Sequence, residues 1–476
     1  MRRALLALPL ACALLACGGP VVDDTAISER DRLYGEQLHP QLLAEFGGPY
    51  PGEEARYVAE VGERVAAAAG LGRQCVFTLV NSEVVNAFAI PGCFIYVTRG
   101  LVAIVRSEAE LASVLGHELA HILGRHAQRQ ERQSIWRRLG VIAVSVTGSD
   151  RLTRLASQAE QYFALRYSRK QEYEADDLSV TYLRKAGYDP FAAADMLAAL
   201  QRQEEFVVAT RGRDTARSVP EWALSHPLTE RRIESARRTA VATGLKDNAL
   251  PEFAQRYLNE VDGLLYGDDP RQGFVVGRRF EHPIMRISFE APPGFTLTNS
   301  PQAIGLSGPG GISGEFGGGA ARGDLASYAE ALVAHVVGNA PAEVIDASAF
   351  LINGLPAIIT QVRVAAGEQT VPLAIAVYDG RDGQYYHFVI ISPPADAQAA
   401  AVAALLRSFR RLSPEEAAAL RPRFIRTIRA APGDTVETLA RRVADPAPRA
   451  LFELLNGDAP VRPGETVKIV TYADPR

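Results

Sequence analysis

The sequence is poor in the features that mark several protein classes. Its 476 residues include only four cysteines, and the formal net charge is −4. No strongly basic block is present, so nucleic acid is not expected as a partner. Beyond the N-terminal segment no apolar run reaches about 18 residues, which argues against a later membrane span. The hydrophobic share of 47% suffices for buried cores, and this length predicts about two to four domains.

The N-terminal segment reads MRRALLALPLACALLACGGP. Two arginines precede an apolar run that ends in small residues, which is typical of a secretory signal. Residues 14–17 resemble the bacterial lipobox. That resemblance implies a signal peptide over 1–16, a lipidated Cys17 that anchors the protein to a membrane, and a linker over 17–27. The residue after the cysteine is glycine, which in enteric-type sorting implies the outer membrane. A plain signal peptide with an incidental cysteine is the alternative.

Two cysteines remain beyond this segment and the lipobox, Cys75 and Cys93. They flank a β-rich segment with a turn at residues 81–83. An exported chain folds in an oxidising compartment, where disulfides form and persist. We therefore expect a disulfide between them, and two separate buried thiols are the alternative.

The most informative stretch is LGHELAHILGRHAQ, residues 115–128. Each residue of a helix advances the side chain by about 100°, so His117 and His121 share one face and Glu118 flanks it. The third histidine, His126, falls on roughly the opposite side. In the His-Glu-x-x-His motif the two histidines bind zinc and the glutamate acts as general base. A chance match on an amphipathic helix is the alternative.

A zinc protease needs a third protein ligand. The extended motif with a third histidine fails, because Ala127 occupies the required position. Residues 167–188 offer carboxylates instead. Glu172 and Asp176 are four apart on one predicted helical face, so one can bind the metal while the other orients a ligand histidine. Glu174 lies off that face. Alone, this segment could equally be a solvated acidic face.

HELAH together with SRKQEYEAD resembles a family of zinc metalloproteases. The family includes the CAAX prenyl protease, the heat-shock protease HtpX and periplasmic outer-membrane-assembly proteases. The resemblance implies that Glu172 is the third zinc ligand and that Asp176 supports the site. It also implies that one coordination position stays open for water, whose proton Glu118 accepts and later passes to the leaving amine.

Two further segments resemble the same family. NAFAIPGCFIYVTRGL, residues 86–101, resembles the strand along the substrate cleft, with Cys93 where the family has a second glycine. An extended substrate is expected to pair with this strand by β-augmentation. The residues expected to make that pairing are Asn86, Ala87, Phe88 and Ala89.

SHPLTERRI, residues 225–233, resembles the family's His-Pro motif with an arginine six residues on. That arginine is Arg232, which is expected to support the site. A histidine in such a turn is usually a capped loop residue. By resemblance to the lipoprotein-processing and periplasmic members, however, His226 is a candidate fourth zinc ligand that acts as a latch and keeps the enzyme latent.

The fold class expected is α+β with several domains. Residues 28–262 are predicted to form a mainly helical, gluzincin-like zinc-protease domain with a small β-sheet. Residues 275–412 faintly resemble the PsbP-like α+β fold, and the Gly-rich stretch 307–319 within them is predicted to be a flexible loop. Residues 425–472 resemble a LysM unit of βααβ order, a module that often binds glycans such as peptidoglycan.

These features predict a zinc metalloendopeptidase with one Zn²⁺ per chain. We expect a lipid-anchored protein of the bacterial envelope that faces the periplasm and hydrolyses misfolded or unassembled envelope proteins, as part of protein quality control. The alternative is a non-catalytic periplasmic chaperone or a peptidoglycan-binding scaffold. No catalytic constellation is apparent in residues 275–412.

Overall fold

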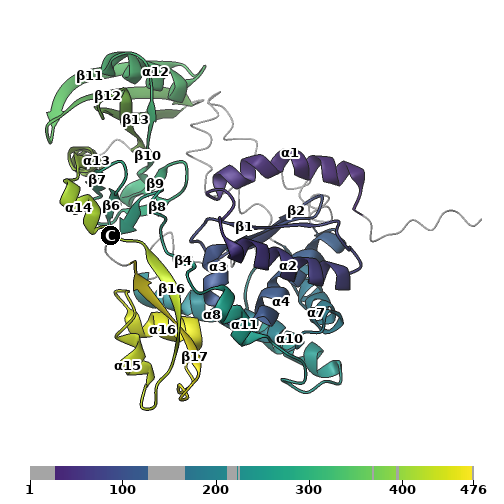
Figure 1. Ribbon diagram of the computed structural model, residues 1–476. Helices are drawn as coiled ribbons and strands as arrows, with labels where there is room; N and C mark the ends of the chain where they lie inside the picture. Colours follow the sequence, from purple (N-terminus) through teal and green to yellow (C-terminus); the bar gives the residue numbers. More distant parts are fainter. Residues whose placement is uncertain are drawn as a thin grey trace, which may run out of the picture.

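The computed structural model describes most of the chain and has a mixed α+β architecture, which confirms the expected class (Figure 1). Its strands form four sheets within the described residues. None of the described helices is long and apolar enough to cross a membrane. Cys17 and the signal segment lie outside the described residues. The structure describes residues 27–126, 167–211, 222, 226–366, 369–392 and 396–473.

A mainly helical unit surrounds a three-stranded sheet in the N-terminal half of the chain (Figure 1). The sheet order is β1-β3-β2, with β1 parallel and β2 antiparallel to β3, so β2 lies at an edge. Its strands are β1 (Val76–Val80), β2 (Ala87–Ile90) and β3 (Phe94–Thr98). The helices are α1 (Glu29–Glu45), α2 (Glu53–Ala68), α3 (Arg99–Ile104), α4 (Glu108–Leu123), α7 (Arg169–Ala186), α8 (Ala192–Arg211), α10 (Glu230–Ala242) and α11 (Ala254–Glu260).

Helix α4 is the central element of this unit. Its N-cap Ser107 accepts a hydrogen bond from the backbone N–H of Glu110, which satisfies one of the amides at the helix start. Every residue from Glu108 to His121 is buried, because α2, α7 and α8 pack around the helix. The buried carboxylate of Glu108 accepts hydrogen bonds from the hydroxyls of Tyr57 and Tyr188. The first turn of α4 is thereby tied to two other parts of the unit.

A disulfide joins Cys75 and Cys93. Cys93 has φ of 63°, the left-handed backbone conformation that glycine adopts most readily. Glycine adopts this conformation without strain, which agrees with the glycine that the family's pattern has at this position. The bond ties the residue before β1 to the turn between β2 and β3. A crosslink across a sequence separation of 18 residues contributes about 3 kcal/mol by loop-closure entropy.

The middle of the chain forms two packed antiparallel sheets. The larger sheet has the order β11 (Ala342–Ile352), β12 (Leu355–Ala366), β13 (Gln369–Asp379), β14 (Gln384–Ile391), β10 (Ser313–Ala320), β9 (Ile304–Ser307) and β8 (Thr296–Asn299). The smaller has the order β15 (Arg410–Arg411), β7 (Ile287–Glu290), β6 (Arg279–His282) and β5 (Phe274–Val276). The helical elements are a short 3₁₀ turn (Pro309–Gly311), α12 (Leu325–Val337), α13 (Asp396–Arg407) and α14 (Pro414–Ala419).

The Gly-rich stretch 307–319 is not a flexible loop, so that prediction was wrong. Its second half is strand β10, which pairs with β14 on one side and β9 on the other. A side chain at Gly314 would place its Cβ 2.4 Å from the carbonyl oxygen of Val389. Glycine at this position therefore permits a close approach between strands, and not chain mobility.

The C-terminal unit has the element order strand, helix, helix, strand. These elements are β16 (Arg423–Arg429), α15 (Val436–Ala440), α16 (Pro448–Asn456) and β17 (Thr466–Tyr472). Strand β16 pairs with β17 and also with β4 (Leu265–Tyr266), which follows the helical unit in sequence. The buried side chains of Leu451, Phe452 and Ile469 belong to the same hydrophobic cluster as the core around α4. The two units thus share one core.

Lys468 connects this C-terminal unit to the end of α3, just before α4. Its side chain is fully buried, and its ammonium group donates hydrogen bonds to the carbonyl oxygens of Ala103 and Val105. These carbonyls lie at the end of α3, where helices leave acceptors without intrahelical partners. Burial lowers the pKa of Lys468 to about 7.

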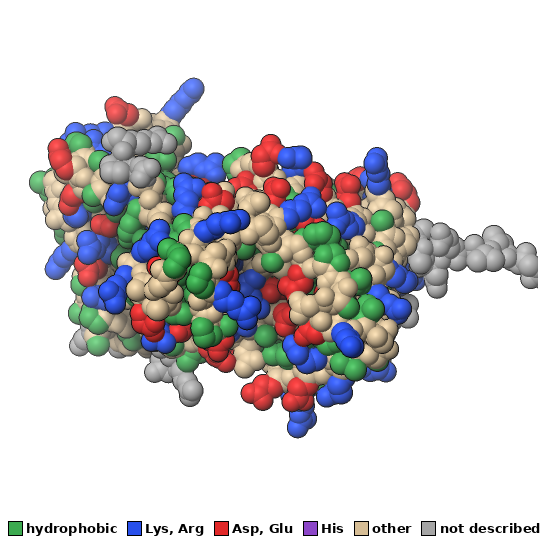
Figure 2. All heavy atoms as spheres, turned by 60° about the horizontal axis from the view of Figure 1, so that its bottom comes forward, with side chains coloured by type: hydrophobic (Ala, Val, Ile, Leu, Met, Phe, Trp, Pro, Cys, Tyr) green, Lys and Arg blue, Asp and Glu red, His purple; other side chains and the backbone are tan. Residues whose placement is uncertain are grey.

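The exposed charges are mixed in sign. On the face shown in Figure 2, acidic and basic side chains alternate over the surface and do not gather by sign. This face therefore offers no extended field of one sign that would steer a highly charged partner.

We predict that Lys468 gives the folding stability a distinct pH dependence. Its folded-state pKa of about 7 lies below the ordinary value of 10.5, so between these pH values the unfolded chain binds more protons. Stability therefore rises with pH across this range. The free energy of unfolding of the wild type, minus that of Lys468→Met, should increase by a few kcal/mol from pH 7 to pH 10 in urea titrations.

Lys185→Met is the matched control, because Lys185 is an exposed lysine of α7. The free energy of unfolding of the wild type, minus that of Lys185→Met, should show no comparable rise with pH. Parallel pH profiles for the wild type and Lys468→Met would contradict the burial of a lysine with a lowered pKa.

Candidate metal centre and active site

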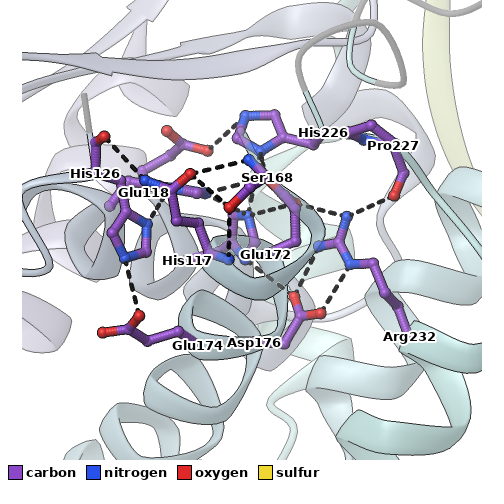
Figure 3. A network of polar contacts seen from close by, with 12 residues as sticks. His117, Glu118, His126, Ser168, Glu172, Glu174, Asp176, His226, Pro227 and Arg232 are labelled. Carbon is purple, nitrogen blue, oxygen red and sulfur yellow. Dashed lines mark hydrogen bonds and ion pairs between the residues drawn. The ribbon is translucent and has the colours of Figure 1, made fainter. Parts of the chain in front are cut away.

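Two helices carry most of the polar side chains of the site. Helix α7 begins with a capping box in which Ser168 and Gln171 satisfy each other's backbone amides, and it ends at Gly187 with φ of 82°. It packs directly against α4. Glu172 lies in its first turn and points toward His117 of α4 (Figure 3), and its carboxylate oxygens lie 3.6 Å from Nε2 of His117 and 3.6 Å from Nε2 of His121. Helix packing thus brings together motifs that are about 50 residues apart in the sequence.

Four buried side chains converge on one point. Ligand atoms of His117, His121, Glu172 and His226 all lie within 4.8 Å of one another. The Nε2 atoms of His117 and His121 are 3.0 Å apart. Nδ1 of His226 is 3.3 Å from Nε2 of His117 and 3.1 Å from Oε1 of Glu172.

This donor set fits zinc. Imidazole nitrogens and a carboxylate oxygen are ordinary zinc ligands, and four of them can make a tetrahedral shell. Imidazole nitrogens packed this closely in a dry interior cannot all satisfy one another, and a cation at their centre would pair with every one of them. The residues present therefore match the metal that the sequence motif implies, with His226 as a fourth member beside His117, His121 and Glu172.

Asp176 and Arg232 support the group from one side. Nδ1 of His117 lies 3.1 Å from Oδ1 of Asp176. Arg232 is buried, donates two hydrogen bonds to the Asp176 carboxylate, and places Nη1 2.7 Å from Oε2 of Glu172. Burial disfavours the charged form of Asp176, but the Arg232 guanidinium outweighs it and lowers the pKa of the carboxyl group.

Glu118 lies beside this group without being a member of it. Burial raises the pKa of its carboxyl group, although His226 and His117 pull the pKa in the opposite direction. A raised pKa suits a residue that must accept and then release a proton. Oε1 of Glu118 is 3.6 Å from Nε2 of His226. His226 therefore lies next to both Glu118 and Nε2 of His117.

Strand β2 lies next to the site. It pairs with β3 alone among the described strands, and α4 packs against it. Asn86 immediately precedes it; its backbone N–H donates a hydrogen bond to the hydroxyl oxygen of Thr98, and that hydroxyl donates to the carbonyl oxygen of Asn86. The residues expected to pair with the substrate therefore lie at or next to a sheet edge, beside helix α4. Of these residues, Ala87, Phe88 and Ala89 form the first part of β2.

The structure corrects the placement of His126. Sequence reasoning continued the helix past this residue and put it on the opposite side from His117. Instead α4 ends at Leu123, Gly124 caps it, and Arg125 has φ of 49°, so the chain folds back. Nδ1 of His126 then lies 2.7 Å from Nδ1 of His121. The glycine was a stop signal that the sequence already contained.

A known peptidase family matches the part of the chain that carries this site. Residues 53–240 match peptidase family M48, which confirms the predicted resemblance to zinc proteases of the outer-membrane-assembly type. The matched range lies inside the predicted protease domain of residues 28–262 and contains all four converging side chains.

Curated relatives share this region. A beta-barrel assembly-enhancing protease of Yersinia pestis is 32% identical over 198 residues, which cover 39% of this chain and 38% of that one. The protein of the same name from Escherichia coli K12 is 30% identical over 175 residues, or 34% of each chain. The mitochondrial metalloendopeptidase OMA1 of Arabidopsis thaliana is 34% identical over 116 residues, covering 24% and 23%. The chain thus spans less than half the length of these relatives.

Likenesses among solved structures are weak. Cyanobacterial PsbP from Synechocystis sp. PCC 6803 has a TM-score of 0.24 and 14% identity, and covers 29% of this chain and 98% of that one. A protein of unknown function from Pseudomonas aeruginosa has a TM-score of 0.18 and 18% identity, covering 24% and 83%. Scores this low carry no argument, so the PsbP-like fold of residues 275–412 stays a prediction.

We predict that the purified protein holds about one zinc per chain. Glu172→Ala and His121→Ala should lose most of it, because each variant removes a converging ligand atom. Elemental analysis after dialysis against a weak chelator measures the content. Asp177→Ala, on the exposed side of the same helix α7, is the control and should keep its zinc. Full zinc in Glu172→Ala would assign the ligand role to another carboxylate.

Proposed function

We propose that the protein is a zinc-dependent metalloendopeptidase. The observation that carries the proposal is the buried convergence of His117, His121 and Glu172, with Glu118 beside them. A purely structural zinc site needs no such carboxylate next to its ligands, whereas a hydrolase needs a base. The family match over residues 53–240 supports the same conclusion.

Each side chain takes a distinct part in the proposed reaction. When bound, zinc supplies Lewis-acid polarisation of the scissile carbonyl and of the attacking water. Glu118 accepts the proton from that water and delivers it to the leaving amine. Asp176, held by Arg232, orients His117 through its Nδ1 atom. An extended peptide adds to the edge of β2, which brings its backbone alongside α4.

Glu118→Gln is expected to abolish peptide hydrolysis and leave zinc content unchanged. The amide keeps the size of the side chain but cannot accept the proton, and general base catalysis contributes roughly 10²–10⁴-fold in rate. A fluorogenic casein assay measures the loss, with Glu234→Gln, at an exposed position of α10, as the control. Wild-type activity in Glu118→Gln would remove the proposed base. An inactive wild type that binds zinc would favour the chaperone or scaffold alternative.

We further propose that His226 is a latch. With Nδ1 among the ligand atoms and Nε2 toward Glu118, it takes the place that water and substrate need. Trp222 stacks on its ring, with centroids 4.3 Å apart, which stabilises this position. A site closed by four protein ligands is of the structural type. Hydrolysis then requires His226 to leave, and only the open fraction of molecules is competent.

His226→Ala should bind zinc less tightly yet cleave unfolded protein faster, roughly several-fold, because every molecule is then open. The comparison is the rate of casein cleavage in excess zinc for the wild type, His226→Ala and the exposed control His335→Ala. A slower His226→Ala enzyme with full zinc would make His226 a substrate-binding or transition-state residue instead of a latch.

The cellular location and the protein substrates are part of the proposal. The names of the bacterial relatives, beta-barrel assembly-enhancing proteases, support a role on misfolded or unassembled envelope proteins. Lipidation of Cys17, with the protein on the outer membrane and facing the periplasm, rests on the lipobox resemblance alone. Peptidoglycan binding by residues 425–472 rests on the LysM resemblance, whose expected strand-helix-helix-strand order these residues have.

A further inference from the structure

The two ligand histidines of α4, His117 and His121, have different side chains next to Nδ1. Each uses Nε2 toward the converging group, so its Nδ1 faces away from the metal position. Behind His117 is a carboxylate, Asp176, at 3.1 Å. Behind His121 is a second histidine, His126, whose Nδ1 lies 2.7 Å from that of His121. Beyond His126 is a carboxylate again, with Oε2 of Glu174 3.6 Å from Nε2 of His126.

Zinc binding determines which ring nitrogen of His121, and therefore of His126, carries the proton. A neutral histidine that binds zinc through Nε2 carries its proton on Nδ1. His121 therefore donates from Nδ1, and Nδ1 of His126 must be the acceptor. A neutral His126 that accepts at Nδ1 carries its own proton on Nε2, which faces Glu174. Only this arrangement of protons lets neutral His121 hydrogen-bond to His126 while His126 presents an N–H to the Glu174 carboxylate.

The local backbone is built to place His126 here. A Cβ on Gly124 would lie 2.4 Å from Nε2 of His126, so only glycine leaves room for the ring. The left-handed residue Arg125 turns the chain back toward α4. The side-chain amide of Gln171 then donates to the carbonyl oxygen of His126, at 3.0 Å. Gln171 is also the capping-box residue of α7, so the start of that helix holds His126.

We propose that His126 and Glu174 are positioning residues that hold His121 as an Nε2 zinc ligand through a His121–His126–Glu174 relay, in which His126 is within hydrogen-bond distance of His121 and faces the Glu174 carboxylate at 3.6 Å. The proposal rests on the zinc site proposed above. It gives both ligand histidines a carboxylate support, directly for His117 and through one imidazole for His121. All three carboxylates involved, Glu172, Glu174 and Asp176, come from α7, so a single helix supplies both the ligand and the supports.

A merely structural role for His126 makes a different prediction. If the buried ring only filled space, any side chain of similar size would serve and zinc affinity would not depend on its acceptor atom. In a relay, the acceptor at the Nδ1 position is what matters. Asparagine can place its side-chain oxygen near that position, whereas leucine fills the space without an acceptor.

The first test is the zinc dissociation constant, measured by chelator competition on the full chain. His126→Leu and His126→Ala should weaken binding by about 10- to 100-fold, the usual cost of losing such a support. His126→Asn should restore most of the affinity. Glu174→Gln should cost only about two- to fivefold, because its side chain is 38% exposed and water screens it. Asp177→Asn, an exposed carboxylate of α7, is the control and should match the wild type.

The second test uses the wild type, so it decides the matter even if a variant fails to fold. The chain has eight histidines, which suits selective ¹⁵N-histidine labelling and NMR. In the zinc-loaded protein His121 should be protonated at Nδ1 and His126 at Nε2. The reverse tautomer of His126, with its proton on Nδ1, would overturn the relay.

The outcomes separate this proposal from the proposed function. A wild type that binds no zinc removes both. A wild type that binds zinc while His126→Leu and His126→Asn bind it equally well leaves the metallopeptidase intact and overturns the relay. Thermal melting of the zinc-free variants identifies any variant that is misfolded, and its affinity is then disregarded in favour of the NMR result.

Discussion

The structure depends on one electrostatic constraint, the charge balance of the buried polar side chains between α4 and α7. Three carboxylates are buried there, on Glu118, Glu172 and Asp176, and the one buried guanidinium beside them, that of Arg232, pairs with Glu172 and Asp176. Buried charges are costly unless they are paired. When all three acids are ionised, a divalent cation would neutralise the remaining two negative charges. The imidazole nitrogens that converge beside them would supply its other contacts.

The rest of the chain holds these two helices in place. Buried contacts surround α4 from its first turn, where Glu108 binds two tyrosines, to its last, where His121 stacks on Tyr167 with ring centroids 3.8 Å apart. The C-terminal unit takes part through Lys468 and through the core that both units share. It is therefore part of the scaffold of the site, whatever ligand its outer surface binds.

Local spacing in the sequence predicted the two histidines of the site, and the family resemblance added Glu172 and His226. The four-residue spacing of His117 and His121 places both on one face of α4, and the structure brings them together with Glu172. His126 could not be placed in this way, because a helix continued past Gly124 turns it away from the site. The prediction of a flexible loop over residues 307–319 was wrong because it relied on glycine content. Composition alone cannot tell a mobile loop from a strand such as β10, whose glycines permit close packing. The insertion of Lys468 near the start of α4 joins residues more than 360 apart and leaves no local pattern.

Anomalous X-ray diffraction at the zinc absorption edge tests the account most directly, on crystals of the wild-type protein grown without added metal. The account predicts one strong peak between α4 and α7, about 2.0–2.2 Å from a ring nitrogen of His117, one of His121 and an oxygen of Glu172. A peak bound instead by Glu174 or Asp176 would contradict it, and so would a site between α4 and α7 with no metal.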